Sequence, residues 1–202
     1  MTNVFHLKTV MIGQPSSGKS SIINRIIFNK YDPFINTTIG AQFFTKLIGT
    51  NNKLEIWDTA GQERYRALVP MYLRNAVIVC VVISLEKKNN ESIDNEKEYW
   101  LNYLQQNNTM TPYYKKILLY NKCDLNPDFV FHNDERFDLN CVISCKTNMG
   151  IDEFTNSLEN VLTNIKEDDL YKNMKIPIPN EINLNRNKSY LLFTKVMKCS
   201  LL

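Results

Sequence analysis

The eight residues from Gly13 to Ser20 constrain the fold of this chain more than any other stretch. They match the pattern G-x-x-x-x-G-K-[S/T]. The apolar stretch Leu7 to Ile12 precedes them, and the isoleucines between Ile22 and Ile27 follow at the spacing of one helical face. A glycine-rich loop between a strand and a helix is typical of phosphate binding, because its backbone N–H groups and the helix N-terminus attract anions.

Each residue type in this loop has a chemical role. Glycine lets the backbone approach the phosphates, Lys19 is expected to reach the β- and γ-phosphates, and the Ser20 hydroxyl is expected to ligate Mg²⁺. The residues predicted to contact nucleotide here are Gly13, Pro15, Ser16, Ser17, Gly18, Lys19, Ser20 and Ser21.

Further along the chain, apolar runs of strand length recur. Gln42 to Ile48 and Lys53 to Trp57 are predicted strands, and the Gly-Thr-Asn-Asn turn signal between them favours an antiparallel hairpin. The runs Ala76 to Ile83 and Lys116 to Tyr120 are typical of parallel strands that are covered on both faces.

Helical spacing of apolar residues predicts two long helices, over Ile93 to Leu104 and over Ile151 to Ile165. Strands that alternate with helices favour an α/β fold with an open, mostly parallel sheet and one antiparallel edge strand. After Ile165 the pattern fails, because Pro177 and Pro179 cannot continue a helix. We therefore expect one domain over residues 1–166 and a flexible tail over residues 167–202.

Composition argues against several classes of function. The net charge of +3, from 24 basic and 21 acidic residues, is too balanced for a nucleic-acid-binding surface, so no nucleic-acid partner is expected. Five cysteines without a Cys-x-x-Cys pair, and only two histidines, argue against a zinc site and for a reducing compartment. The longest apolar run, Ala76 to Ile83, is too short to span a membrane.

The stretch from Asn121 to Asp124, directly after a predicted strand, resembles the N-K-x-D motif of the Ras superfamily of small GTPases. The resemblance implies a P-loop NTPase G domain, with a six-stranded sheet and helices on both faces, that binds GTP/GDP with Mg²⁺. It also implies that Asp124 accepts hydrogen bonds from guanine, that the Lys122 stem lies along the base, and that Asn121 braces the loop.

Two other segments resemble parts of the same nucleotide site. Ser144, Cys145 and Lys146 resemble the S-A-K segment, whose backbone N–H groups meet the guanine carbonyl. In the first switch, Thr38 resembles the threonine that coordinates Mg²⁺ and senses the γ-phosphate. Tyr31 lies where the family keeps an aromatic over the guanine, although a core or surface aromatic is an equally good interpretation of this residue alone.

The stretch from Trp57 to Tyr65 resembles the second switch of Ras-like GTPases almost without change. This implies that Asp58 holds Mg²⁺ through water, that Gly61 offers its N–H to the γ-phosphate, and that Gln62 orients the attacking water. The predicted catalytic residues are Gln62, Lys19 and Thr38, and the predicted Mg²⁺ ligands are Ser20, Thr38 and Asp58.

Sequence around both switches resembles the Rab family, and within it the early-endosomal Rabs. Phe43, Trp57 and Tyr72 fall on the Rab aromatic triad, which implies an effector-binding surface, and ordinary packing between the switches is compatible with the same residues.

The chain ends Lys198-Cys199-Ser200-Leu201-Leu202, a C-a-a-X box that predicts prenylation of Cys199 and attachment to a membrane.

The Rab resemblance implies a function and a set of partners. The function is a GTP/GDP switch with slow GTP hydrolysis in vesicle trafficking, on the cytoplasmic face of endosomal membranes and with a cytosolic pool. The partners are a guanine nucleotide exchange factor, a GTPase-activating protein, Rab effectors, a prenylation escort and a GDP-dissociation inhibitor. Two alternatives stay open: a nucleotide-bound scaffold with little turnover, and a phosphoryl-transfer kinase, against which Asp124 and Gln62 argue.

Pro15 departs from the family pattern within the phosphate loop. Proline has no backbone N–H, and this position lies near the γ-phosphate, so Pro15 bears on the hydrolysis rate and on the fit of an activating protein's arginine. Hydrolysis is still predicted, because the three catalytic residues are present.

A second departure is a short connection before the sixth strand, which the resemblance implies just ahead of Ser144. Only 19 residues separate Asp124 from Ser144, and Pro127 lies early among them. The helix that the family has between Asn126 and Asn140 is therefore predicted to be shortened or absent.

Overall fold

A computed structural model describes residues 5–49, 52–107 and 114–167 of the chain. Its strands are β1 (Phe5–Ile12), β2 (Ala41–Ile48), β3 (Asn52–Thr59), β4 (Ile78–Ser84), β5 (Lys115–Asn121) and β6 (Leu139–Val142). Its α-helices are α1 (Lys19–Phe28), α2 (Val69–Leu73), α3 (Asn90–Gln106) and α4 (Ile151–Glu167), and two 3₁₀ helices are η1 (Glu63–Leu68) and η2 (Cys123–Leu125).

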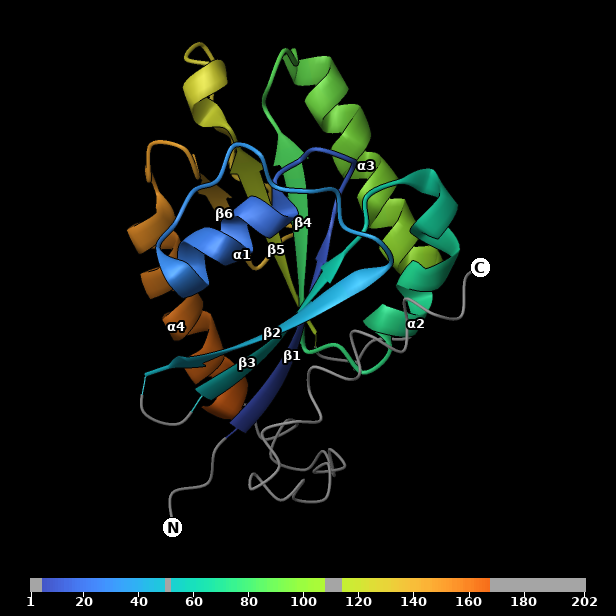
Figure 1. Cartoon of the computed structure of the whole chain (residues 1–202), viewed down its shortest axis with the longest axis vertical. Coiled ribbons are helices and arrows are strands. Elements are labelled where there is room, and N and C mark those ends of the chain that lie inside the picture. Colours follow the sequence, from blue (N-terminus) through green and yellow to red (C-terminus); the bar gives the residue numbers. More distant parts are fainter. Residues whose placement is uncertain (1–4, 50–51, 108–113, 168–202) are drawn as a thin grey trace.

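The six strands form one sheet in the order β2-β3-β1-β4-β5-β6 (Figure 1). The β2–β3 pair is antiparallel, and all the other neighbouring pairs are parallel. The predicted α/β fold, with its antiparallel edge strand and its β2–β3 hairpin, is therefore confirmed. The short helices η1 and α2 were not predicted, because their sequence lacks a long helical period.

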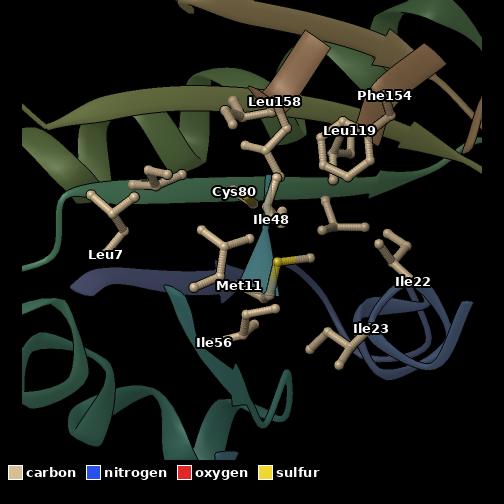
Figure 2. Packing of buried hydrophobic residues seen from close by; sticks show 14 of the residues in the cluster. Leu7, Met11, Ile22, Ile23, Ile48, Ile56, Cys80, Leu119, Phe154 and Leu158 are labelled. Carbon is tan, nitrogen blue, oxygen red and sulfur yellow. The ribbon is translucent and has the colours of Figure 1, made fainter. Parts of the chain in front are cut away.

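Helices cover both faces of the sheet, as predicted. On one face, α1 and α4 bury Ile22, Ile23, Phe154 and Leu158 against β1, β4 and β5, as Figure 2 shows. On the other face, α2 and α3 pack through residues such as Leu73, Trp100 and Leu104. The two layers hold the sheet rigid, so the loops at the strand ends have fixed starting points.

The parallel strands end in register along one edge of the sheet. Met11 of β1 pairs with Asp58 of β3, and Ser84 of β4 pairs with Asn121 of β5. The loop after each of these strands therefore begins at the same edge, which is where open α/β sheets bind their ligands.

No helix forms between Asn126 and Asn140, all of which the structure describes, so the predicted loss of that helix is confirmed. Aromatic side chains take over its packing role. The rings of Phe129 and Phe131 lie 5.1 and 6.2 Å from the ring of Tyr120, and Phe137 is buried. A group of ion pairs joins the same segment to α3.

Asp134 is the centre of these ion pairs. Arg136 donates to both its carboxylate oxygens, from Nε at 2.8 Å and from Nη2 at 2.7 Å, and Lys97 Nζ of α3 lies 3.2 Å from Oδ2. The Arg136 hydrogen bond is the largest cause that lowers the pKa of Asp134 below its ordinary value. The carboxylate therefore stabilises the fold above the pKa of the unfolded chain, and this contribution is lost as the pH falls.

Replacing Asp134 by asparagine should lower the free energy of unfolding at pH 7 by about 1.5–3 kcal/mol, the range for hydrogen bonds to a charged group. The loss should shrink towards pH 3, because the wild-type carboxyl is then partly protonated in the unfolded chain. Urea unfolding at both pH values measures the difference. Glu135→Gln, at an exposed neighbour in the same segment, is the matched control, and an equal loss at both pH values would contradict the prediction.

The tail predicted over residues 167–202, including Cys199, lies outside the described residues apart from Glu167, which ends α4. The domain boundary stays a prediction. In the described part of the chain, no helix combines the length and the apolar character needed to cross a membrane.

Candidate nucleotide-binding site

Lys19 opens α1, and its side chain turns back over the glycine-rich loop. Its Nζ donates to the carbonyl oxygens of Gly13 and Gln14, both at 3.0 Å, and lies 3.4 Å from Ser17 Oγ. Burial lowers the pKa of the Lys19 ammonium to about 8, although the Asp58 carboxylate opposes this shift. An anion in the loop would stabilise the charged ammonium, so the geometry suits a phosphate group.

The phosphate loop is hydrogen-bonded directly to the predicted base-recognition segment. Asn121 at the end of β5 is almost fully buried, and its Nδ2 donates to the carbonyl oxygen of Ser17 at 2.9 Å. Gly18 has φ +92°, and a Cβ at this position would lie 2.2 Å from Asn121 Nδ2. Glycine is therefore needed where the two segments meet.

The three predicted Mg²⁺ ligands lie together. Asp58 Oδ2 accepts from Ser20 Oγ at 2.6 Å and from Thr38 Oγ1 at 3.2 Å, and the two hydroxyl oxygens are 3.0 Å apart. Asp58 Oδ1 is buried and has no hydrogen-bond partner in the described structure. Burial also raises the pKa of Asp58, although both hydroxyl groups oppose this. An all-oxygen cluster with an unsatisfied buried carboxylate fits a hard cation such as Mg²⁺.

The second switch begins in contact with the phosphate loop. A Cβ at Gly61 would lie 2.7 Å from the carbonyl oxygen of Gln14 and from the nitrogen of Pro15. Gln62 is half-buried, and its Oε1 accepts from Arg64 Nε at 2.8 Å. Arg64 therefore holds the oxygen with which Gln62 would orient a water molecule. Of the other two predicted catalytic residues, Lys19 lies over the phosphate loop and Thr38 belongs to the oxygen cluster.

The predicted base-binding residues, with the exception of Ser144, line a pocket of about 260 Å³. Its lining residues are Gly18, Ser21, Tyr31, Glu86, Asn121, Lys122, Asp124, Leu125, Cys145 and Lys146. Ser144 Oγ donates to Asp124 Oδ1 at 2.6 Å, and Cys145 Sγ donates to Asn121 Oδ1 at 3.5 Å. Ser144 and Cys145 thus orient the side chains predicted to read the base.

Two residues of this site were missed by the sequence reasoning. Arg25 of α1 donates to the carbonyl oxygen of Cys145 from Nε at 3.0 Å and from Nη2 at 2.6 Å, and thereby ties α1 to the Ser144–Lys146 loop. Glu86, after β4, lines the pocket and pairs with Lys122. Neither residue belongs to a motif, and Arg25 and Cys145 are 120 positions apart, so no local pattern could reveal them.

The three aromatics of the predicted effector surface are in contact. The ring of Trp57 lies 5.1 Å from that of Phe43 and 5.5 Å from that of Tyr72. Phe43 is 43% exposed, whereas only 7% of Tyr72 is exposed. Phe43 is therefore the most exposed of the three rings, and the buried Tyr72 packs against Trp57.

Comparison with known proteins gives the family. The family model described as Ras of Complex, Roc, domain of DAPkinase matches residues 8–124, which is more than half of the chain. The chain belongs to the Roc/Ras superfamily of GTPase domains. The matched residues include the phosphate loop, the oxygen cluster and the base-recognition segment.

Curated relatives of this GTPase domain carry Rab names. Ras-related protein Rab-22A of Homo sapiens is 42% identical over 122 residues, which cover 59% of this chain and 60% of the relative. Ras-related protein Rab5 of Nicotiana tabacum is 39% identical over 126 residues, with 61% and 60% covered. These relatives agree with the resemblance to early-endosomal Rabs, and this GTPase domain spans about three fifths of their length.

Proposed function

We propose that this chain is a Rab-like GTP/GDP switch that hydrolyses GTP slowly and regulates vesicle trafficking on the endocytic pathway. The hydrogen bond from Asn121 to Ser17 is the observation that carries the proposal, because it joins the base pocket to the phosphate loop. One nucleoside diphosphate or triphosphate can then reach from Asp124 to Lys19.

The residues of the site have distinct roles in this proposal. Asp124 accepts from the guanine edge, Lys19 pairs with the β- and γ-phosphates, and Gln62 orients the water that attacks the γ-phosphate. Ser20, Thr38 and Asp58 would hold Mg²⁺, which supplies positive charge against the phosphate oxygens when it is bound. Thr38 and the Gly61 N–H sense the γ-phosphate, so hydrolysis would release both switches.

Replacing Gln62 by leucine should slow GTP hydrolysis at least about tenfold while leaving GDP affinity within about twofold, because leucine cannot orient water. Single-turnover phosphate release from preloaded GTP measures the rate, and displacement of a fluorescently labelled GDP measures the affinity. Glu63→Gln, at the exposed neighbouring position, is the matched control. Equal hydrolysis by wild-type chain and Gln62→Leu would remove the proposed role of Gln62.

A nucleotide-bound scaffold with little turnover is the second candidate, and Pro15 favours it. Pro15 lies at the surface of the phosphate loop beside Gly61 and offers no N–H to a phosphate. Phosphate release from the wild-type chain no faster than from Gln62→Leu, with GTP still bound, would support the scaffold over the switch.

The wider proposal concerns membranes and partners. Prenylated Cys199 would attach the chain to the cytoplasmic face of endosomal membranes, with a cytosolic pool held by a GDP-dissociation inhibitor. A prenylation escort, an exchange factor, an activating protein and effectors that bind Phe43, Trp57 and Tyr72 complete the cycle.

Imaging of a tagged chain beside its Gln62→Leu, Ser20→Asn and Cys199→Ser variants tests the membrane attachment. The Cys199→Ser variant should be wholly cytosolic, and its retention on membranes would contradict the lipid anchor.

A further inference from the structure

Glu86 lies at the rim of the base pocket and belongs to none of the motifs that define the site. It follows β4, and its Oε2 is 2.6 Å from Nζ of Lys122, whose stem is expected to lie along the base. Both residues line the pocket together with Asp124. The ion pair is therefore part of the surface that a base would meet.

Hydrogen bonds with Asn126 and Asn121 hold the backbone on either side of Glu86. Asn126 Nδ2 donates to the carbonyl oxygens of Leu85 and Lys88, at 3.2 and 3.0 Å, and the Leu85 N–H donates to the Asn121 carbonyl at 2.8 Å. These bonds fasten the segment that carries Glu86 to the segment that carries Lys122.

An ion pair with α3 also holds the segment that carries Glu86. Lys88 pairs with Glu96, of which only 8% is exposed. A buried carboxylate needs a partner, so this pair fixes the segment against the helix. Glu86 is thus presented to Lys122 by a fixed backbone rather than by a free loop.

Two carboxylates line the base pocket together with Lys122: Glu86, its ion-pair partner, and Asp124. The Lys122 hydrogen bond is the largest cause that lowers the pKa of Glu86, and the charge of Asp124 opposes this shift. Without Glu86, the Lys122 ammonium would be attracted to Asp124, the group that must accept from guanine. A carboxylate already paired with lysine is a weaker acceptor for the base.

We propose that Glu86 is a positioning residue for guanine recognition, which draws the Lys122 ammonium away from Asp124 and so leaves the Asp124 carboxylate to the base. This inference rests on the proposed binding of guanine nucleotide. It predicts that Glu86 affects both how long GDP stays bound and how well the exocyclic amine of guanine is recognised.

The test compares release of GDP and of IDP, which lacks that amine, from the full chain with Mg²⁺ present. Glu86→Gln should release GDP about three- to fivefold faster, as expected for one partly exposed ion pair, and should narrow the preference for GDP over IDP. In a Lys122→Met background, which keeps the stem and removes the charge, Glu86→Gln should have no further effect. Glu91→Gln, the same change at an exposed position of α3, is the matched control.

The outcomes separate this inference from the function on which it rests. If the wild-type chain binds GDP but Glu86→Gln changes neither the release rate nor the GDP/IDP ratio, the role of Glu86 is wrong and nucleotide binding stands. An equal effect of Glu86→Gln with and without Lys122 would also overturn it, because the role requires the lysine. A wild-type chain that binds no GDP would overturn the proposed function and this inference together.

Discussion

Replacing Asp124 by asparagine should weaken GDP binding by roughly 100- to 1000-fold, the loss expected when a charge-assisted bidentate pair meets a mismatched group. Asparagine keeps the size of Asp124 and can still accept from Ser144 Oγ, which donates to Oδ1 at 2.6 Å. Its amide would however place an N–H₂ group against the donors of guanine. Competition with a fluorescent GDP, measured at equilibrium, gives the change in affinity.

The same variant should bind xanthosine diphosphate better than GDP, because xanthine has a carbonyl where guanine has the exocyclic amine. Asp128→Asn, an exposed aspartate that follows in the next loop, is the matched control and should leave GDP affinity unchanged. An Asp124→Asn chain with wild-type GDP affinity would show that the base does not lie against Asp124.

The second large effect is expected at Asp58. Replacing it by asparagine should abolish the slowing of GDP release by Mg²⁺, which in the wild-type chain should be tenfold or more between excess Mg²⁺ and a chelator. The reason is that Asp58 is the only carboxylate of the oxygen cluster and has one buried oxygen without a described partner. Release rates of a fluorescent GDP in the two conditions measure the effect.

Folding stability separates this loss from unfolding. Burial raises the pKa of Asp58, so its ionisation destabilises the fold as the pH rises through that pKa. Without Mg²⁺ at pH 7, Asp58→Asn should therefore be at least as stable to urea as the wild-type chain. Asp152→Asn, at an exposed position of α4, is the control for both measurements. A Mg²⁺ effect that survives in Asp58→Asn would place the cation elsewhere.

Much of the fold was predictable because its signals are local. Apolar runs located the central strands to within three residues of their observed ends, and the turn signal after Ile48 gave the antiparallel hairpin. The missing helix between Asn126 and Asn140 followed from chain length, since 19 residues cannot hold a long helix and both of its connections. The aromatic cover that replaces this helix was not predictable, because rings at 129 and 131 meet Tyr120 only through the folded sheet.

Residue types and their spacing were enough to predict the chemistry of the candidate site, because the phosphate loop, the predicted oxygen ligands and the predicted base-recognition segment are each a local pattern. How these segments meet depends on the folded sheet. The contacts of Arg25 with Cys145, of Asn121 with Ser17 and of Glu86 with Lys122 join residues far apart in the chain. Such contacts depend on strand order and register, which local patterns do not encode, because a hydrogen bond between distant loops exists only once the sheet has placed both of them.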